Sequence, residues 1–174
     1  METKDWFGIM QILWVEHVRE GEVIHREEKI LNTLHYLGEN FLLLSLFKGG
    51  NAPNVFIPDQ YYLGLDSRST IAVADTSSNL TESFVNGYMR QPCSSTTGFT
   101  IEVVNGVHRA SSQIVTFSAS GGGWGPVKNI FLSDKQNTTG ILISSAKLSS
   151  PLSVVSGDYI NMQMALSLRY CPSL

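Results

Sequence analysis

The 174-residue sequence is poor in cysteine, in net charge and in long apolar runs, and each shortage excludes a class of protein. Its two cysteines, Cys93 and Cys171, are far apart and fit neither a disulfide framework nor a zinc site, so two free thiols are expected. The longest apolar run, Phe41 to Phe47 with Ser45 inside it, is too short to cross a bilayer. A net charge of −3 without a basic cluster lacks the electrostatic footprint of nucleic-acid binding. We therefore expect neither membrane insertion nor a nucleic-acid partner.

Recognisable catalytic motifs are also missing from the sequence. The four histidines form no HExxH zinc motif, and no serine lies in a G-x-S-x-G elbow. Glu82 with Glu102, or Asp66 with Asp75, could supply the two carboxylates of a glycosidase, but nothing sets these pairs apart from other acidic residues. The sequence therefore predicts a binding or structural protein with no catalytic residues, no metal and no cofactor.

What the sequence does contain is a series of short strands separated by Gly, Ser and Pro turns. In the clearest of them, SGDYINMQMALSLR, apolar and polar residues alternate, so one face of the strand can be buried while the other stays polar. The apolar face comprises Ile160, Met162, Met164, Leu166 and Leu168. Strands are predicted at residues 61–66, 70–74, 98–104, 114–119, 127–132, 140–146 and 158–170. Such a series without intervening helices predicts a mainly β fold, an antiparallel β-sandwich of jelly-roll or Ig-like type.

The first fifty residues have a different composition, because charged residues concentrate there. Two strands, 9–19 and 22–29, flank Glu20-Gly21, which favours a hairpin that places Glu16 opposite His25 and Val18 opposite Val23. An apolar stripe through residues 34–44 predicts one helix, begun by a cap at Asn32 or Thr33 and ended by Gly49-Gly50. Gly38 within it is expected to mark a close approach to the sheet.

Residues 51–58, with two prolines, have the composition of a linker. We therefore predict an attachment element at residues 1–50 and a β-sandwich domain at 51–174. The charged hairpin residues of the attachment element are expected to face a polar partner or solvent. They are His17, Arg19, His25 and Arg26.

A long loop, residues 75–92, and a glycine-rich turn contain the candidate contact residues. Trp124 is either an exposed platform for a sugar or a neighbouring subunit, or a ring that closes the end of the core. Arg90 either pairs with an acidic partner or binds within its own chain, and Tyr88 could join Trp124 on a glycan-binding surface. Asp158, after Ser-Gly, could bind calcium, but a turn-capping role is favoured because no DxDxDG spacing surrounds it.

Several segments in a fixed order resemble a family of small tailed-bacteriophage virion proteins, often labelled tail fibre proteins. The resemblance covers roughly residues 30–170, and the helical segment NTLHYLGENFLL is similar to one found near the start of many phage structural proteins. The segments are YYLGL at 61–65, NGYMRQ at 86–91, SGGGWGPVKNIFLSD at 120–134 and TGILISSAKLSSPLSVVSGDYINMQMALSLR at 139–169.

The resemblance implies a non-enzymatic structural protein of the virion, made in the cytoplasm of the bacterial host. We expect a homo-oligomer that is attached to other virion proteins of the capsid, neck or tail, as a decoration or fibre-type component. A carbohydrate-binding module that contacts a host surface glycan is the alternative. The candidate contact residues are then Trp124, Tyr88 and Arg90.

Overall fold

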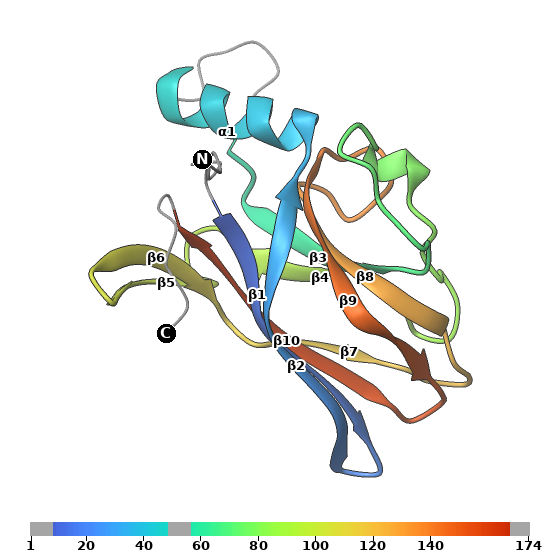
Figure 1. Cartoon of the computed structure of the whole chain (residues 1–174). Coiled ribbons are helices and arrows are strands. Elements are labelled where there is room, and N and C mark those ends of the chain that lie inside the picture. Colours follow the sequence, from blue (N-terminus) through green and yellow to red (C-terminus); the bar gives the residue numbers. More distant parts are fainter. Residues whose placement is uncertain (1–8, 49–56, 168–174) are drawn as a thin grey trace, which may run out of the picture.

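The structure, a computed structural model, describes residues 9–48 and 57–167 and is built almost entirely of strands (Figure 1). One α-helix and one short 3-10 helix accompany the strands. In chain order the elements are β1 (Ile9–Arg19), β2 (Glu22–Leu34), α1 (Tyr36–Lys48), β3 (Gln60–Asp66), η1 (Ser77–Asn79), β4 (Gln91–Ser94), β5 (Phe99–Val104), β6 (Val107–Ser112), β7 (Val115–Ser118), β8 (Gly125–Ser133), β9 (Leu142–Val154) and β10 (Tyr159–Ser167).

These ten strands form a single antiparallel sheet rather than two separate ones. Neighbouring strands follow the order β4-β3-β8-β9-β2-β1-β10-β6-β5, and β7 also pairs with β10. The sheet curves so strongly that β4, at one end, comes close to β7, which leaves it nearly closed into a barrel. The predicted mainly β, antiparallel class with one α-helix is thus confirmed. The continuous sheet does not confirm the jelly-roll or Ig-like sandwich type.

Alternation along β10 places its apolar side chains inside the barrel, as the sequence predicted. Ile160, Met162 and Met164 are buried, whereas Leu166 is partly exposed and Leu168 lies outside the described residues. Residues from β1, β7, β8 and β9 complete one large core cluster around them. The core is therefore the space enclosed by the curved sheet.

The first fifty residues contribute strands to the middle of this sheet. β1 lies between β2 and β10, and β2 connects it to β9. Ile12, Val15 and Phe41 are buried in the same cluster as β10. Helix α1 packs on β9, where a Cβ added at Gly38 would lie 2.1 Å from the carbonyl oxygen of Ile143, so the predicted close approach is confirmed. The strand pairing therefore does not set residues 9–34 apart from the rest of the described sheet.

The hairpin register is correct at the turn and shifts by one residue beyond it. Val18 pairs with Val23, as predicted, and the turn uses Glu20 and Gly21, both with positive φ (52° and 83°). A bulge between His17 and Val18 then moves Glu16 opposite Arg26, so its predicted pairing with His25 is wrong.

Several predicted boundaries also differ from the structure. β2 continues to Leu34 because Asn32–Leu34 pair with β9, so neither Asn32 nor Thr33 begins the helix, which starts at Tyr36. Residues 70–72 have no regular secondary structure and residues 73–74 form a turn, so the predicted strand at 70–74 is wrong, and β4 and β6 were not predicted. The polar Asn-Thr pair is typical of a helix cap, but backbone pairing with β9 outweighs that local preference.

Candidate functional site

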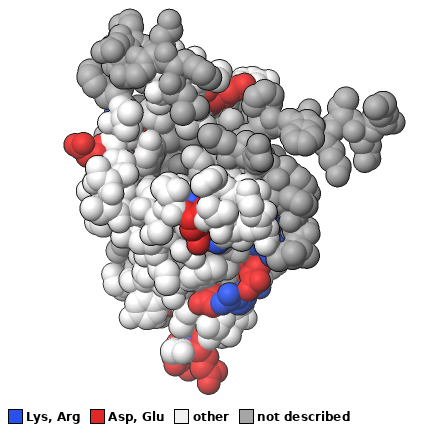
Figure 2. Space-filling model, turned by 90° about the vertical axis from the view of Figure 1, so that its left-hand side faces the viewer, with Lys and Arg blue, Asp and Glu red and all other residues white. Residues whose placement is uncertain are grey.

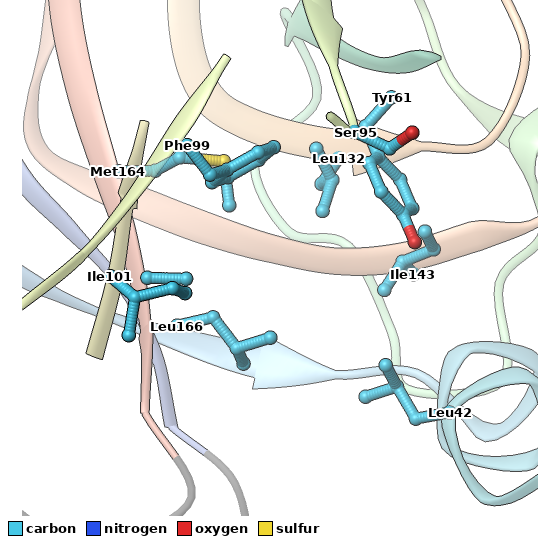
Figure 3. A pocket seen from close by; sticks show the side chains of 10 residues that line it. Leu42, Tyr61, Ser95, Phe99, Ile101, Leu132, Ile143, Met164 and Leu166 are labelled. Atoms are coloured by element: carbon cyan, nitrogen blue, oxygen red, sulfur yellow. The ribbon is translucent and has the colours of Figure 1, made fainter. Parts of the chain in front are cut away.

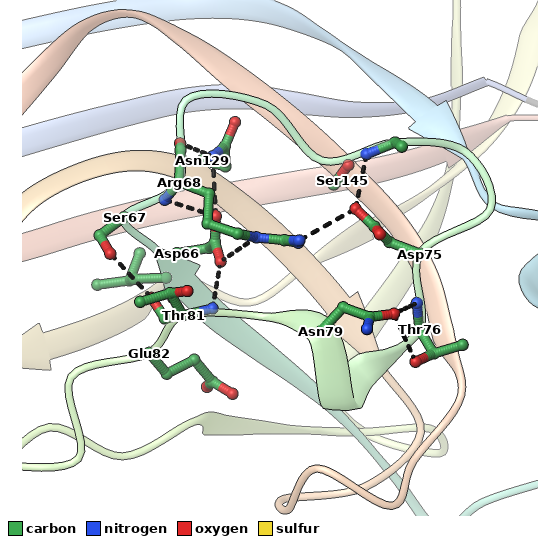
Figure 4. A network of polar contacts seen from close by, with 12 residues as sticks. Asp66, Ser67, Arg68, Asp75, Thr76, Asn79, Thr81, Glu82, Asn129 and Ser145 are labelled. Atoms are coloured by element: carbon green, nitrogen blue, oxygen red, sulfur yellow. Dashed lines mark hydrogen bonds and ion pairs between the residues drawn. The ribbon is translucent and has the colours of Figure 1, made fainter.

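The long connection between β3 and β4 covers the outer face of β8 and is held there by a polar network (Figure 4). Asp66, at the end of β3, is 1% exposed. It accepts hydrogen bonds from Arg68 Nε, from the backbone N–H of Thr81 at 2.7 Å and from Asn129 Nδ2 at 3.0 Å. Arg68 also donates to Asp75, so one guanidinium connects both carboxylates of the candidate acid pair. The network fixes the loop on the sheet.

Arg90 and Glu82 form a fully buried ion pair beneath the same loop. Both side chains are 0% exposed, and Arg90 Nη2 donates to Glu82 Oε1 at 2.6 Å. Arg90 Nη1 donates to the backbone carbonyls of Lys135 and Asn137 at 3.0 and 2.7 Å, and the guanidinium lies 4.8 Å from the centre of the Phe131 ring. Arg90 therefore binds within its own chain, one of the two roles considered for it, and connects the β3–β4 loop to the β8–β9 loop.

Trp124 and Tyr88 belong to an aromatic cluster at one end of the core. Trp124 is 6% exposed, and its Nε1 donates to the carbonyl of Asn86 at 3.1 Å. Its ring meets Tyr88 edge-on, with the centroids 5.5 Å apart. Burial raises the pKa of Tyr88, whose neutral hydroxyl donates to Glu82 and accepts from the N–H of Leu65. Trp124 thus closes the end of the core, and none of the three candidate contact residues, Trp124, Tyr88 and Arg90, presents an exposed surface.

The end of the β1–β2 hairpin is fastened to the turn between β9 and β10 by Asp158. This carboxylate, 1% exposed, accepts from Arg19 Nε at 2.9 Å, from the N–H of Val155 at 2.9 Å and interacts with His17 Nε2 at 2.7 Å. The Arg19 hydrogen bond is the main reason that the pKa of Asp158 is well below its usual range. Asp158 caps the turn as favoured from the sequence, and His17 is buried behind it.

Lowering the pH is expected to weaken the interaction of Asp158 with the β1–β2 hairpin. Asp158 is charged in both the folded and unfolded chain above its ordinary pKa of about 4, so its stabilising contribution is complete there. Below that pH the unfolded chain binds the proton first, and the contribution is lost as the pH falls toward the depressed pKa of the folded state. Urea denaturation of the wild type and of Asp158→Asn, at about pH 7 and about pH 3, should show a smaller acid-induced loss in the variant. Equal losses in both proteins would contradict this role.

Of the two remaining hairpin residues of the attachment element, Arg26 has partners inside the chain, whereas His25 Nε2 makes no hydrogen bond among the described residues. Arg26 donates to Glu16 and Glu28 and lies 5.5 Å from the centre of the Trp14 ring. His25 Nε2 is 3.8 Å from a carboxylate oxygen of Glu27. Figure 2 shows acidic side chains at the lower tip of the molecule, where this hairpin ends. The tip of the hairpin is therefore negatively charged, and the ion pairs of Arg26 stabilise its two strands.

An apolar groove of about 210 Å³ opens on the other side of the molecule, between α1 and the β5–β6 hairpin (Figure 3). Leu42 of α1, Tyr61 of β3 and Leu166 of β10 line it, together with Phe99 and Ile101 of β5. This groove was not predicted from the sequence. The alternation of Phe99, Ile101 and Val103 was its only signal, and that pattern does not distinguish a buried face from an exposed one.

The described residues supply no evidence for catalysis or metal binding. Glu82 is bound to Arg90 in the interior, whereas Glu102 on β5 pairs with Arg109, so the two are engaged separately. Within residues 9–48 and 57–167 no three His, Cys, Asp or Glu side chains gather as metal ligands, and no helix is long and apolar enough to span a membrane. Cys93 is a buried free thiol whose pKa is raised to about 11 by burial, and Cys171 lies outside the described residues.

Comparison with known proteins identifies the family. Residues 33–167 match the family described as Podophage GP4 fiber I protein gp80. The match covers more than three quarters of the 174 residues and agrees with the span over which phage virion motifs were identified. No curated protein matches the chain. The chain thus belongs to this podophage fibre protein family and is a structural protein of the phage virion.

Proposed function

We propose that this fibre-family protein is a non-enzymatic building block that assembles with copies of itself through the edge strand β5. The observation that supports this most strongly is the exposure of apolar side chains on that edge. Ile101 is 70% exposed and Val103 58% exposed, although both lie on the strand face that leads into the apolar groove. β5 pairs with β6 on one side and is the last strand in the order of the described sheet.

An apolar edge of this kind favours association. Unpaired backbone groups beside exposed Ile and Val side chains form a template on which another chain can dock, and monomeric proteins usually protect such edges with charges or bulges. On β5 the charge lies on the opposite face, where Glu102 pairs with Arg109. The face with Ile101 and Val103 therefore keeps its apolar character.

The adjoining groove supplies a complementary surface for a second copy. Leu42, Leu166 and Tyr61 line it, and Ile101 of the exposed stripe lines it as well (Figure 3). When a stripe of one subunit enters the groove of the next, the contact joins two different surfaces and can repeat around a ring. A closed ring of this type matches the homo-oligomer expected from the sequence.

Replacing Ile101 by Asp is expected to give a folded monomer. The side chain is mostly exposed, so the substitution removes little from the core of the subunit. It would, however, bury a charge at the proposed contact, which is strongly unfavourable. Thr100→Asp is the matched control, because Thr100 is exposed on the same strand but faces the other way. Native mass spectrometry of all three proteins measures the oligomer. A wild-type monomer at all concentrations, or equal masses for both variants, would refute the contact.

We further propose that the β1–β2 hairpin contacts other virion proteins. It forms the lower tip of the molecule (Figure 1), and its strand β2 pairs only with β1 near that tip, because β9 pairs with β2 only through Asn32–Leu34. Val23 and Ile24 near its tip are about half exposed. Chemical cross-linking of purified virions through the exposed Lys29 tests this role, and a failure to reach any other virion protein counts against it. Immunogold labelling of the same virions assigns the position among capsid, neck and tail.

A further inference from the structure

A buried histidine, His35, lies between the end of β2 and the beginning of α1. It is 0% exposed. Its backbone N–H donates to the carbonyl of Ile143 on β9 at 3.0 Å, and its carbonyl accepts the N–H of Glu39 in the first turn of α1 at 2.8 Å. His35 is therefore fixed at a junction between a strand, a helix and a neighbouring strand, with no access to solvent.

Both ring nitrogens of His35 have polar partners. Nδ1 is 3.2 Å from the carbonyl oxygen of Val73, and Nε2 is 2.9 Å from Oγ of Ser145. A carbonyl oxygen can only accept a hydrogen bond, so Nδ1 carries the proton and donates it. In the neutral ring Nε2 is then the acceptor, and the Ser145 hydroxyl donates to it. The neutral ring thus joins the β3–β4 connection to β9 with both of its nitrogens satisfied.

A second proton on the ring would disturb this arrangement. Nε2–H would have to donate to Ser145, whose hydroxyl proton would lose its one acceptor among the described residues. The positive charge would also be buried, and it would lie at the positive end of the α1 dipole. Burial is the main reason that the pKa of His35 is lowered. The site therefore favours the neutral ring.

The charged groups that face His35 belong to the β3–β4 connection. Asp75 favours the charged ring and Arg68 opposes it, and these two side chains bind each other at 3.1 Å (Figure 4). Asp75 also accepts the N–H of Ala72. The partner on β9 is a neutral hydroxyl, and Glu39 of α1 is exposed. The one carboxylate that favours the charged ring is thus already engaged by other partners.

We propose that His35 is an acid-sensitive switch that holds α1 and residues 72–75 on β9 while its ring is neutral. Above about pH 6.5 the ring is neutral whether this contact is closed or open, so the closed form is fully favoured. Below that pH the open form binds the proton first, and the closed form loses stability as the pH falls toward the lowered pKa of the closed site. Because Leu42 of α1 lines the apolar groove, opening the contact displaces one wall of that groove.

Hydrogen exchange of the full-length protein at about pH 7 and about pH 5, corrected for the intrinsic pH dependence of exchange, tests the switch. In the wild type, the protection of amides in residues 35–45 and 72–75 should fall by up to about twentyfold at the lower pH, the limit set by an ordinary histidine pKa of about 6.5. His35→Asn keeps a hydrogen-bond donor but cannot gain a proton, so its protection should be equal at both pH values, even if lower overall. His108→Asn is the matched control, because His108 is exposed on β6, and it should behave like the wild type.

Two results would overturn the proposal: equal protection of these amides at both pH values in the wild type, or the same acid-induced loss in His35→Asn. Nitrogen-15 NMR of the wild-type imidazole keeps the test decisive if His35→Asn fails to fold. The ring should carry its proton on Nδ1 and stay neutral below the ordinary histidine range, about pH 6.5. A ring that becomes charged within that range while α1 stays protected would refute the switch. Oligomer mass tests the β5 contact separately, so either proposal can fail without the other.

Discussion

A protein that begins at residue 51 is expected to remain unfolded. Without β1 and β2, the strands β9 and β10 lose the two strands that connect them, and the sheet is divided in its middle. Ile12, Val15, Ile30 and Phe41 leave the core at the same time. Burying a side chain of this size contributes about 1.5–3 kcal/mol, so the combined loss approaches the whole stability of a typical domain, about 5–15 kcal/mol.

Circular dichroism and urea denaturation of the 51–174 fragment measure this directly. A fragment that begins at residue 9 is the control, because it keeps all ten strands and should unfold cooperatively. Cooperative unfolding by the 51–174 fragment would instead support the division into an attachment element and an autonomous domain, which was predicted from composition.

The second large effect is expected from Glu82→Gln. The variant leaves the charge of Arg90 fully buried without a counter-charge. Removing one partner of a buried ion pair typically costs about 3–5 kcal/mol. The free energy of unfolding from urea denaturation should fall by about that amount. Because the same guanidinium holds the β8–β9 loop, hydrogen exchange at the backbone of residues 134–140 should also become faster.

Glu102→Gln provides a control with the same chemical change on a partly exposed pair. Glu102 binds Arg109 at the surface of the β5–β6 hairpin, where solvent screens the interaction, so a much smaller loss is expected. Replacing both buried partners, in Glu82→Leu with Arg90→Met, should recover part of the stability because no unpaired charge remains. Similar losses in Glu82→Gln and Glu102→Gln would show that the buried pair has no special role.

Local patterns predicted the elements whose structure depends on neighbouring residues in the sequence. The alternation in β10 gave the buried faces of Ile160, Met162 and Met164, and Glu20-Gly21 gave the hairpin turn. The continuation of β2 through Asn32 was not predictable in this way. It depends on pairing with Ala146, which lies more than a hundred residues away in the sequence. A bulge such as that after His17 likewise has no reliable local signature.

The burial of the candidate contact residues was likewise not predictable from local sequence patterns. Trp124, Tyr88 and Arg90 lie among glycines and polar residues, a context typical of exposed loops. Their burial results from a long loop that folds back over the sheet, and from Glu82, whose position beside Arg90 no spacing rule indicates. Tyr62 was part of a recognised motif, but its position beside the β8–β9 loop results from the fold and has no local sequence signal.

The pairing of β1 with β10 has a consequence for how the protein is made. Ile9 of β1 lies beside Ser167 of β10. One edge of β1 therefore stays unpaired until β10 has been synthesised. Contacts between such distant residues form slowly, because a long loop must be closed before they stabilise the chain. While the ribosome is still producing the middle of the sequence, β1 and β2 can form only a hairpin with an unprotected edge. Host chaperones that shield this nascent hairpin would therefore increase the yield of folded protein.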